Sequence, residues 1–159
     1  LTEDIQMKKI ERTTVEDGRF LIDDAPMYLF NNGTNYESYR MLGAHRVKDA
    51  GGTEGYRFAV WAPNAKSVSV VCDGNGWDRN LGRMSKHISS GIWELFIPGI
   101  TEGQNYKYSV ESYDGKTVMK SDPYAFYSEV RPATASVTAD LSYTWHDEKW
   151  IDSREDRAV

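Results

Sequence analysis

One tryptophan stands in a loop whose neighbours could orient a flat ligand. The segment Cys72–Asp78 reads Cys-Asp-Gly-Asn-Gly-Trp-Asp, so Trp77 lies among glycines and polar side chains. An indole that is exposed beside hydrogen-bond donors and acceptors can stack on a pyranose ring, whose faces carry C–H groups and whose edge carries hydroxyls. Asn75 and Asp78 could supply polar contacts, because they are close to Trp77 in the sequence. A protein-docking surface or plain exposure fits the same pattern equally well.

The other chemistry-bearing residues lack the spacing that a catalytic or metal site requires. His45, His87 and His146 are scattered, and Cys72 is the single cysteine, so no His or Cys pair supports zinc. The sequence has no Gly-rich phosphate loop and no nucleophile elbow. Asp and Glu total 24, but most lie in turns or charged segments, and nothing favours a pair held across a cleft. We therefore expect no catalytic residue, no metal and no cofactor.

Composition narrows the class of partner. A chain of 159 residues can bury the core of one domain. A net charge of −5 without a Lys/Arg run argues against nucleic-acid binding. No apolar stretch approaches 18 residues, so no membrane span is expected. The charged start at Leu1–Ile10 does not fit a signal peptide, and together with one cysteine it predicts a reducing, cytoplasmic location.

From about residue 53 the apolar residues recur with a period of two, as in β-strands. Turns that carry Gly or Pro separate the alternating segments, and no helical crossover lies between them. This pattern predicts a mostly β fold, an immunoglobulin-like antiparallel β-sandwich of ~100 residues. We expect its strands at 55–62, 67–72, 91–98, 104–111, 116–120 and 135–139.

The alternation also assigns individual side chains to faces. Trp61 and Trp93 occupy alternating positions, and such tryptophans are more often buried in a core than exposed as platforms. Lys107 lies between Tyr106 and Tyr108, which indicates a solvated strand face opposite the two rings.

The first 44 residues differ from the rest in charge and in the pattern of apolar residues. Residues 1–25 are charged and weakly patterned, so we expect a poorly ordered or auxiliary segment there. Residues 26–44 predict a short helical lead-in, and residues 45–140 contain the sandwich.

Within the lead-in, Thr34 and Glu37 have the spacing of a capping box. Tyr36, Tyr39 and Leu42 recur at helical spacing, which indicates a helix that packs on the sandwich.

Six short segments of the chain carry a family resemblance: Leu42–His45, Val60–Ala65, Gly91–Glu94, Tyr106–Tyr108, Lys120–Ala125 and Arg131–Ser136. In their order and spacing they resemble the family 48 carbohydrate-binding module that forms the amino-terminal β-sandwich of 1,4-α-glucan (glycogen or starch) branching enzymes. The resemblance runs from about residue 28 to 150.

The resemblance implies a non-catalytic module that precedes a (β/α)8 barrel. In that family the barrel cuts an α-1,4-glucan and transfers the piece to a 6-hydroxyl, and its catalytic residues lie at the strand ends. Those residues would follow Val159, and residues 141–159 would be the linker to the barrel. The implied partners are α-1,4-glucan (glycogen, starch or maltooligosaccharides) and the intramolecular barrel.

The resemblance also implies roles for named residues. Trp77 would stack on the glucan, Lys107 would contact its hydroxyls, and Tyr113 would take the place of a second aromatic residue. The loop departs from the family pattern at Cys72 and Gly74, where a Gly and a Phe are usual. Loss of the Phe predicts a looser loop.

Two other functions fit the same residues. The module could pack on the barrel as a structural element without binding sugar, as the altered loop and the apolar patch at 20–22 suggest. It could also be the equivalent module of a debranching, isoamylase-type enzyme.

Overall fold

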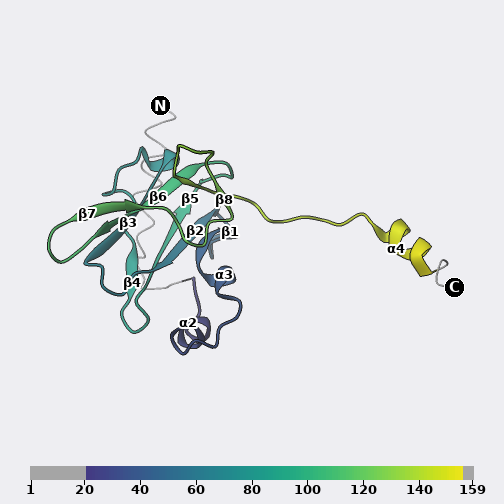
Figure 1. The fold of residues 1–159 in the computed structure, drawn as a ribbon, viewed down its shortest axis with the longest axis horizontal. Coiled ribbons are helices and arrows are strands. Elements are labelled where there is room, and N and C mark those ends of the chain that lie inside the picture. The colour runs from purple at the N-terminus through teal and green to yellow at the C-terminus, as the bar shows by residue number, and fades with distance from the viewer. Residues whose placement is uncertain (1–20, 156–159) are drawn as a thin grey trace.

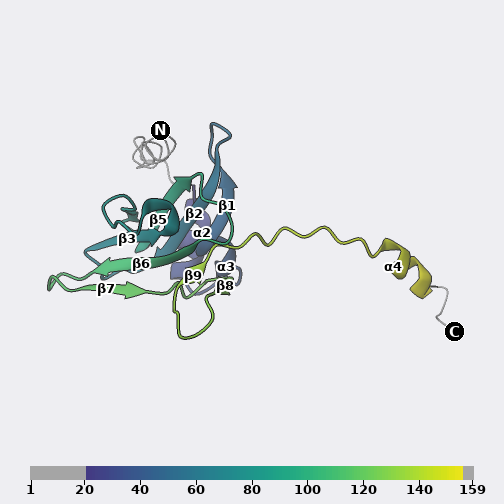
Figure 2. The same ribbon diagram turned by 90° about the horizontal axis from the view of Figure 1, so that it is seen from above.

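Two antiparallel sheets packed face to face form the body of the protein, which confirms the predicted β-sandwich (Figures 1 and 2). The computed structural model describes residues 21–155. The first sheet has the strand order β1-β2-β5-β4, with β1 (Gly43–Lys48), β2 (Glu54–Trp61), β4 (Ser85–His87) and β5 (Ile92–Pro98). The second has the order β3-β6-β9-β8, with β7 also paired to β6: β3 (Ser67–Cys72), β6 (Asn105–Glu111), β7 (Thr117–Lys120), β8 (Tyr127–Ser128) and β9 (Ser136–Val137).

The core between the sheets consists of the alternating apolar side chains. Tyr56 and Phe58 of β2 meet Tyr106 and Tyr108 of β6, and the Phe58 and Tyr106 rings cross edge to face at 5.1 Å. Trp93 is also in this core, as predicted. Burial of large aromatic side chains contributes most to the stability of such a core.

Three strands were not predicted: β1, β4 and β8. β1 is polar along most of its length and lies at the sheet edge, where pairing with β2 rather than an apolar pattern holds it in place. Trp61 departs from expectation as well, because it ends β2 on the outer face and is half exposed.

Helices α2 (Asp24–Asn31) and α3 (Ser38–Met41) pack on the outer face of the first sheet. They form a second, smaller core with Ile22, Met27, Met41, Leu42, Ala59 and Ile92. Residues 21–25 are thus integrated into the fold, whereas residues 1–20 of the predicted auxiliary segment lie outside the described residues.

The predicted capping box is wrong. Asn35 Oδ1 accepts the Glu37 backbone N–H at 2.9 Å, and the Thr34 hydroxyl donates to Leu29 O instead. An Asx turn therefore competes successfully with the Ser/Thr cap. Tyr36 and Tyr39 are exposed and only Leu42 is buried, because α3 is too short to turn all three inward.

The carboxyl-terminal end leaves the sandwich as an extended arm and ends in α4 (Glu148–Glu155), well away from the two sheets (Figures 1 and 2). No helix within residues 21–155 is long and apolar enough to cross a membrane.

Candidate functional site

The loop after β3 is a tight, internally hydrogen-bonded turn. It opens with the short 3-10 helix η1 (Asp73–Asn75). Asn75 is buried, its Oδ1 accepts the Cys72 backbone N–H at 3.0 Å and its Nδ2 donates to Val70 O at 2.9 Å. Both ends of the Asn75 amide are therefore used inside the loop, so this side chain shapes the loop.

The looser loop at Gly74 stays a prediction, but the space beside this glycine is filled. A Cβ at position 74 would lie 2.2 Å from Ile100 Cδ1, so Ile100 already fills the space beside the glycine. The loop is ordered by Asn75 and by this close packing, without a Phe at position 74.

Trp77 is fixed at both its backbone and its indole. Its φ is +61°, in the left-handed region that costs a non-glycine residue roughly 1 kcal/mol or more, and its N–H donates to Cys72 O at 3.0 Å. The indole Nε1 donates to Asp73 Oδ1 at 2.9 Å, and Asp73 Oδ2 accepts the Asn105 backbone N–H at 2.8 Å. The side chain is 40% exposed, so an indole held in one orientation is open to solvent.

The segment that follows Trp77 is tied across the second sheet. Asp78 Oδ1 accepts the Asn80 backbone N–H at 2.8 Å, which leaves Oδ2 for another donor. Arg79 donates to Thr117 of β7, and to Ser67 of β3 and Glu111 of β6. The Lys66 ammonium, with Ser67 and Arg79, holds the pKa of Glu111 at about 2.

Lys107 lies on the same outer face of β6, two residues beyond Asn105 and therefore about 7 Å along the strand. Its Nζ donates to Thr134 Oγ1 at 2.7 Å. An ammonium has three donors, so two remain for a ligand. Asp73 accepts from both the indole and the Asn105 backbone N–H, so the carboxylate that anchors the indole is bonded to β6 two residues from Lys107.

Tyr113 does not join this pair. It lies in the β6–β7 turn, six residues beyond Lys107, which corresponds to about 20 Å of strand. The register places two other exposed side chains on the outer face, Met119 opposite Ser109 and Tyr127 opposite Val137. Neither was predicted, because each belongs to a short strand without an alternating apolar pattern. We call the surface formed by Trp77, Lys107, Met119 and Tyr127 the Trp77 face.

The cysteine and the possible metal ligands of the described residues are not placed for chemistry of their own. Cys72 is fully buried, and burial raises the pKa of its thiol, which disfavours the reactive thiolate. Residues 21–155 contain no group of three or more His, Cys, Asp or Glu placed to hold a metal ion.

The family model of carbohydrate-binding module 48 (isoamylase N-terminal domain) matches residues 41–125. That span contains the loop, the sandwich core and Lys107. The chain belongs to the carbohydrate-binding module 48 family.

The curated relatives carry a more particular name. A 1,4-alpha-glucan branching enzyme of Synechococcus sp. (strain JA-3-3Ab) is 48% identical over 134 residues, which are 84% of this chain and 17% of that enzyme. The branching enzyme of Butyrivibrio fibrisolvens is 47% identical over 136 residues, 85% of this chain and 21% of that enzyme. The predicted resemblance to the module of branching enzymes is thus confirmed, and the chain spans about a fifth of its relatives' length or less.

Solved structures with the same fold include two pullulanases. The Klebsiella pneumoniae pullulanase complexed with maltotriose has a TM-score of 0.51 and 25% identity, covering 65% of this chain and 10% of that one. The Anoxybacillus sp. LM18-11 pullulanase complexed with maltotetraose has a TM-score of 0.54 and 23% identity, covering 75% and 16%. The second match supports the fold alone.

Proposed function

We propose that this chain is a non-catalytic α-glucan-binding module of a 1,4-α-glucan branching enzyme that acts in glycogen or starch biosynthesis in the cytoplasm. Its partners are then α-1,4-glucan (glycogen, starch or maltooligosaccharides) and the catalytic (β/α)8 barrel of the same polypeptide. Membership of the carbohydrate-binding family and the 48% identity to a branching enzyme support this proposal.

The observation that carries the proposal is the anchored, half-exposed indole of Trp77. Asp73 fixes the ring at its Nε1, so no rotamer freedom is lost when a sugar stacks on it. Lys107 lies about 7 Å along the sheet from Asn105, within reach of hydroxyls at the edge of a stacked ring.

The three other candidate residues differ in how directly they could contact a glucan. Asp78 offers its free Oδ2 to a sugar hydroxyl, whereas Asn75 holds the loop in shape. Tyr113 can take part only for a glucan long enough to follow β6 to its far end.

Titration of maltoheptaose into the chain, with binding measured by calorimetry, tests the proposal. Trp77→Ala should weaken the affinity about fivefold or more, since stacking of a ring on an aromatic side chain is worth about 1–3 kcal/mol. Trp61→Ala is the matched control, because Trp61 is a similarly exposed indole on the outer face of the first sheet, and its loss should leave the affinity within twofold. Equal affinities of the two variants would refute the Trp77 site.

A structural module that packs on the barrel is the second candidate. The exposed aromatic side chains of α2 and α3 favour it, since large exposed apolar patches mark interaction surfaces. The two functions use opposite faces and are compatible. A module of a debranching enzyme is less well supported, because the pullulanase matches have only 23–25% identity; an assay for new α-1,6 branches by the longer polypeptide separates the two enzyme classes.

A further inference from the structure

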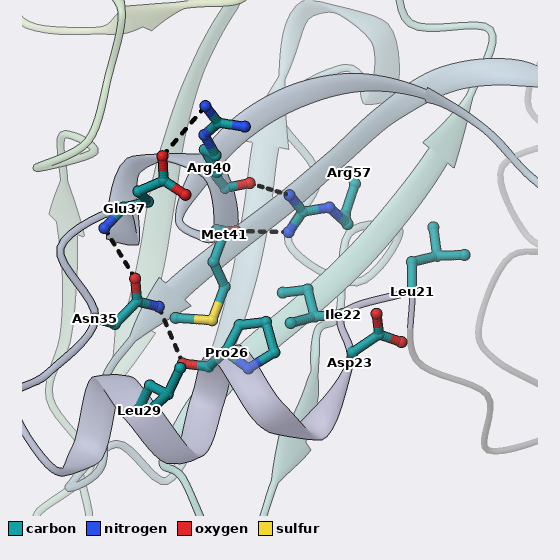
Figure 3. A pocket seen from close by; sticks show the side chains of 10 residues that line it. All are labelled: Leu21, Ile22, Asp23, Pro26, Leu29, Asn35, Glu37, Arg40, Met41 and Arg57. Atoms are coloured by element: carbon teal, nitrogen blue, oxygen red, sulfur yellow. Dashed lines mark hydrogen bonds and ion pairs between the residues drawn. The ribbon is translucent and has the colours of Figure 1, made fainter.

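Two hollows on the surface of the sandwich contain cations that are held in different ways. One is a groove of about 330 Å3 between α2, α3 and the first sheet, and two arginines line it (Figure 3). Arg40 pairs with Glu37 at 3.2 Å, and Arg57 donates to the backbone oxygens of Met41 and Arg40 (Figure 3). Both guanidinium groups of this groove therefore already have acceptors within the fold.

The other hollow, of about 490 Å3, lies beside the edge strand β3 and is basic. Among the described residues its lining holds three cations, Lys66, Arg79 and Arg83, and one carboxylate, Glu111. Three cations and one carboxylate give the lining a net charge of +2, in a chain whose net charge is −5. We call this hollow the β3 pocket.

The backbone beside β3 brings Arg83 to the pocket. Val70 N donates to Gly82 O at 2.8 Å, so the chain runs close along the edge of β3. A Cβ at position 82 would lie 1.8 Å from Val70 O, which means that only glycine allows this approach. Arg83 is thereby placed opposite Ser69 in an isolated antiparallel bridge. The backbone thus anchors Arg83 at the wall of the β3 pocket.

Glu111 holds the other two cations in place. Its Oε1 pairs with Lys66 Nζ at 2.9 Å, and its Oε2 pairs with Arg79 Nη2 at 3.2 Å. Arg79 also donates to Thr117 Oγ1 and Ser67 Oγ, on β7 and β3. A ligand then meets ammonium and guanidinium groups that are already oriented, which lowers the entropic cost of binding.

Most N–H donors of these cations remain available. Lys66 has three donors and uses one of them on Glu111. Within residues 21–155 Arg83 forms no ion pair, and its one hydrogen bond goes to Asn80 Oδ1 at 3.4 Å, which leaves four of its five N–H donors. The β3 pocket therefore offers an incoming anion more donors than its own carboxylate takes up.

The chemistry of the lining favours a phosphate group on a small polar carrier. Guanidinium forks and an ammonium group match the charge and the geometry of phosphate oxygens. Asn80 is exposed and adds an amide that can bond to hydroxyls of the carrier. No aromatic ring from the described residues lines the pocket, which disfavours a nucleotide, because nucleobases stack on aromatic side chains.

We propose that the β3 pocket binds a phosphate monoester carried by a sugar, either a free hexose phosphate or a glucan that bears phosphate groups. The phosphate site rests on the pocket alone, and only the choice of a sugar as the carrier rests on the proposed function. Arg79 follows Trp77 by two residues, so the pocket adjoins the Trp77 loop in the chain.

Titration of glucose 6-phosphate into the nitrogen-15-labelled chain tests the site, with the backbone N–H signals of Asn80 and Arg83 as reporters. Arg83→Gln should weaken the affinity about fivefold or more, because hydrogen bonds between charged groups are stronger than neutral ones. Arg40→Gln is the matched control: it removes the same charge from the groove of Figure 3 and should change the affinity by about twofold or less. Both arginines are exposed, so neither substitution removes core packing.

Three results would overturn the proposal. One is the absence of a saturable shift up to about 20 mM glucose 6-phosphate, well above a millimolar dissociation constant. Another is equal affinity of Arg83→Gln and the unsubstituted chain. The third is binding of inorganic phosphate as tight as that of glucose 6-phosphate, because the sugar would then not be recognised.

A phosphorylated maltoheptaose separates the two carriers. Binding tighter than that of glucose 6-phosphate, and lost in both Arg83→Gln and Trp77→Ala, would support the glucan as the carrier. Equal binding of the two esters, unaffected by Trp77→Ala, would support the free hexose phosphate. Absence of maltoheptaose binding while glucose 6-phosphate still binds would refute only the Trp77 site.

Discussion

The two outer faces of the sandwich are built differently although both expose tryptophan. On the Trp77 face the Asp73 carboxylate accepts a hydrogen bond from the indole of Trp77. Lys107 lies on β6, and the paired strands β3 and β6 carry hydroxyl groups and charges. The opposite face, which we call the helical face, exposes Tyr28, Leu29, Tyr36, Tyr39 and Trp61. There Trp61 meets the ring of Phe30 edge to face, and a groove with aliphatic side chains opens between α2, α3 and the first sheet.

The two tryptophans have similar exposure but different neighbours, so the partner proposed for each follows from its neighbours and not from its exposure. Polar groups that fix one ring and surround it suit a ligand rich in hydroxyls. Several rings around an apolar pocket suit a protein side chain. The Trp77 face therefore fits glucan, and the helical face fits protein.

The substitution with the largest expected effect on stability is at Glu94, on the outer side of the first sheet beneath the helical face. Glu94 is buried, meets His87 Nε2 at 2.9 Å and accepts the backbone N–H groups of Leu21 and Ile22. Glu94→Ala removes a buried carboxylate that accepts from the Leu21 and Ile22 N–H groups, so the free energy of unfolding should fall by about 3 kcal/mol or more in urea titrations. Glu54→Ala removes an exposed carboxylate paired with Arg46, and it should change the free energy of unfolding far less, because solvent screens an exposed ion pair.

The same variant should separate stability from maltoheptaose binding. Glu94→Ala should leave the affinity of the folded fraction unchanged, because Glu94 holds the start of the helical face and makes no contact with the Trp77 loop. An equal loss of affinity and stability would mean that the two faces are not independent.

Asp73→Ala tests whether the orientation of Trp77 matters. The variant keeps the indole but removes its hydrogen bond to the carboxylate. Maltoheptaose affinity should therefore fall about tenfold, which corresponds to the net free energy of one hydrogen bond. Asp49→Ala is the matched control: the Asp49 carboxylate likewise accepts two N–H groups, both from the backbone of the β1–β2 turn, and its loss should leave the affinity unchanged. An unchanged affinity in Asp73→Ala would show that the carboxylate only stabilises the loop.

The sequence predicted the sandwich well and the faces poorly. Alternation identified the core at Tyr56, Phe58, Tyr106 and Tyr108, since burial on one side of a strand imposes a period of two. It misplaced Trp61, because the helices that approach it come from a distant segment and only partly cover it.

The candidate site was predictable in its residue types but not in its arrangement. The anchoring of Trp77 by Asp73 depends on a left-handed backbone that nothing in a Trp residue signals. The register of β7 and β8, which the sequence left open, places Met119 and Tyr127 on the outer face.

A smaller effect comes from the backbone of Trp77. Trp77→Gly should be about 0.5–1 kcal/mol more stable than Trp77→Ala, because glycine adopts a positive φ without strain and this exceeds its extra entropy in the unfolded chain. Urea unfolding measures the difference. Tyr113 is not in the left-handed region, so Tyr113→Gly should be less stable than Tyr113→Ala; the same order at both positions would contradict the assigned backbone.

The smallest effect concerns Asp122, which lies between the sheets and favours neither face. Burial raises its pKa above the ordinary value of 3.8, although it accepts hydrogen bonds from Tyr106 and Tyr108. A raised pKa in the folded state means that its contribution to stability is full below pH 3.8 and is lost as the pH rises through the folded pKa.

The stability advantage of the unsubstituted chain over Asp122→Asn should therefore shrink as the pH rises above 3.8. Urea titrations at several pH values measure it, and the difference between the two proteins cancels the other carboxylates. An advantage that grows with pH would reverse the assigned shift.

The separation of the two faces is tested most directly by following the five indole N–H signals in a nitrogen-15 NMR titration with maltoheptaose. The Trp77 Nε1–H, which donates to Asp73, should shift and saturate with the sugar, while the Trp61 Nε1–H stays in place. A shift of Trp61 with Trp77 unmoved would place the sugar on the helical face and contradict the account.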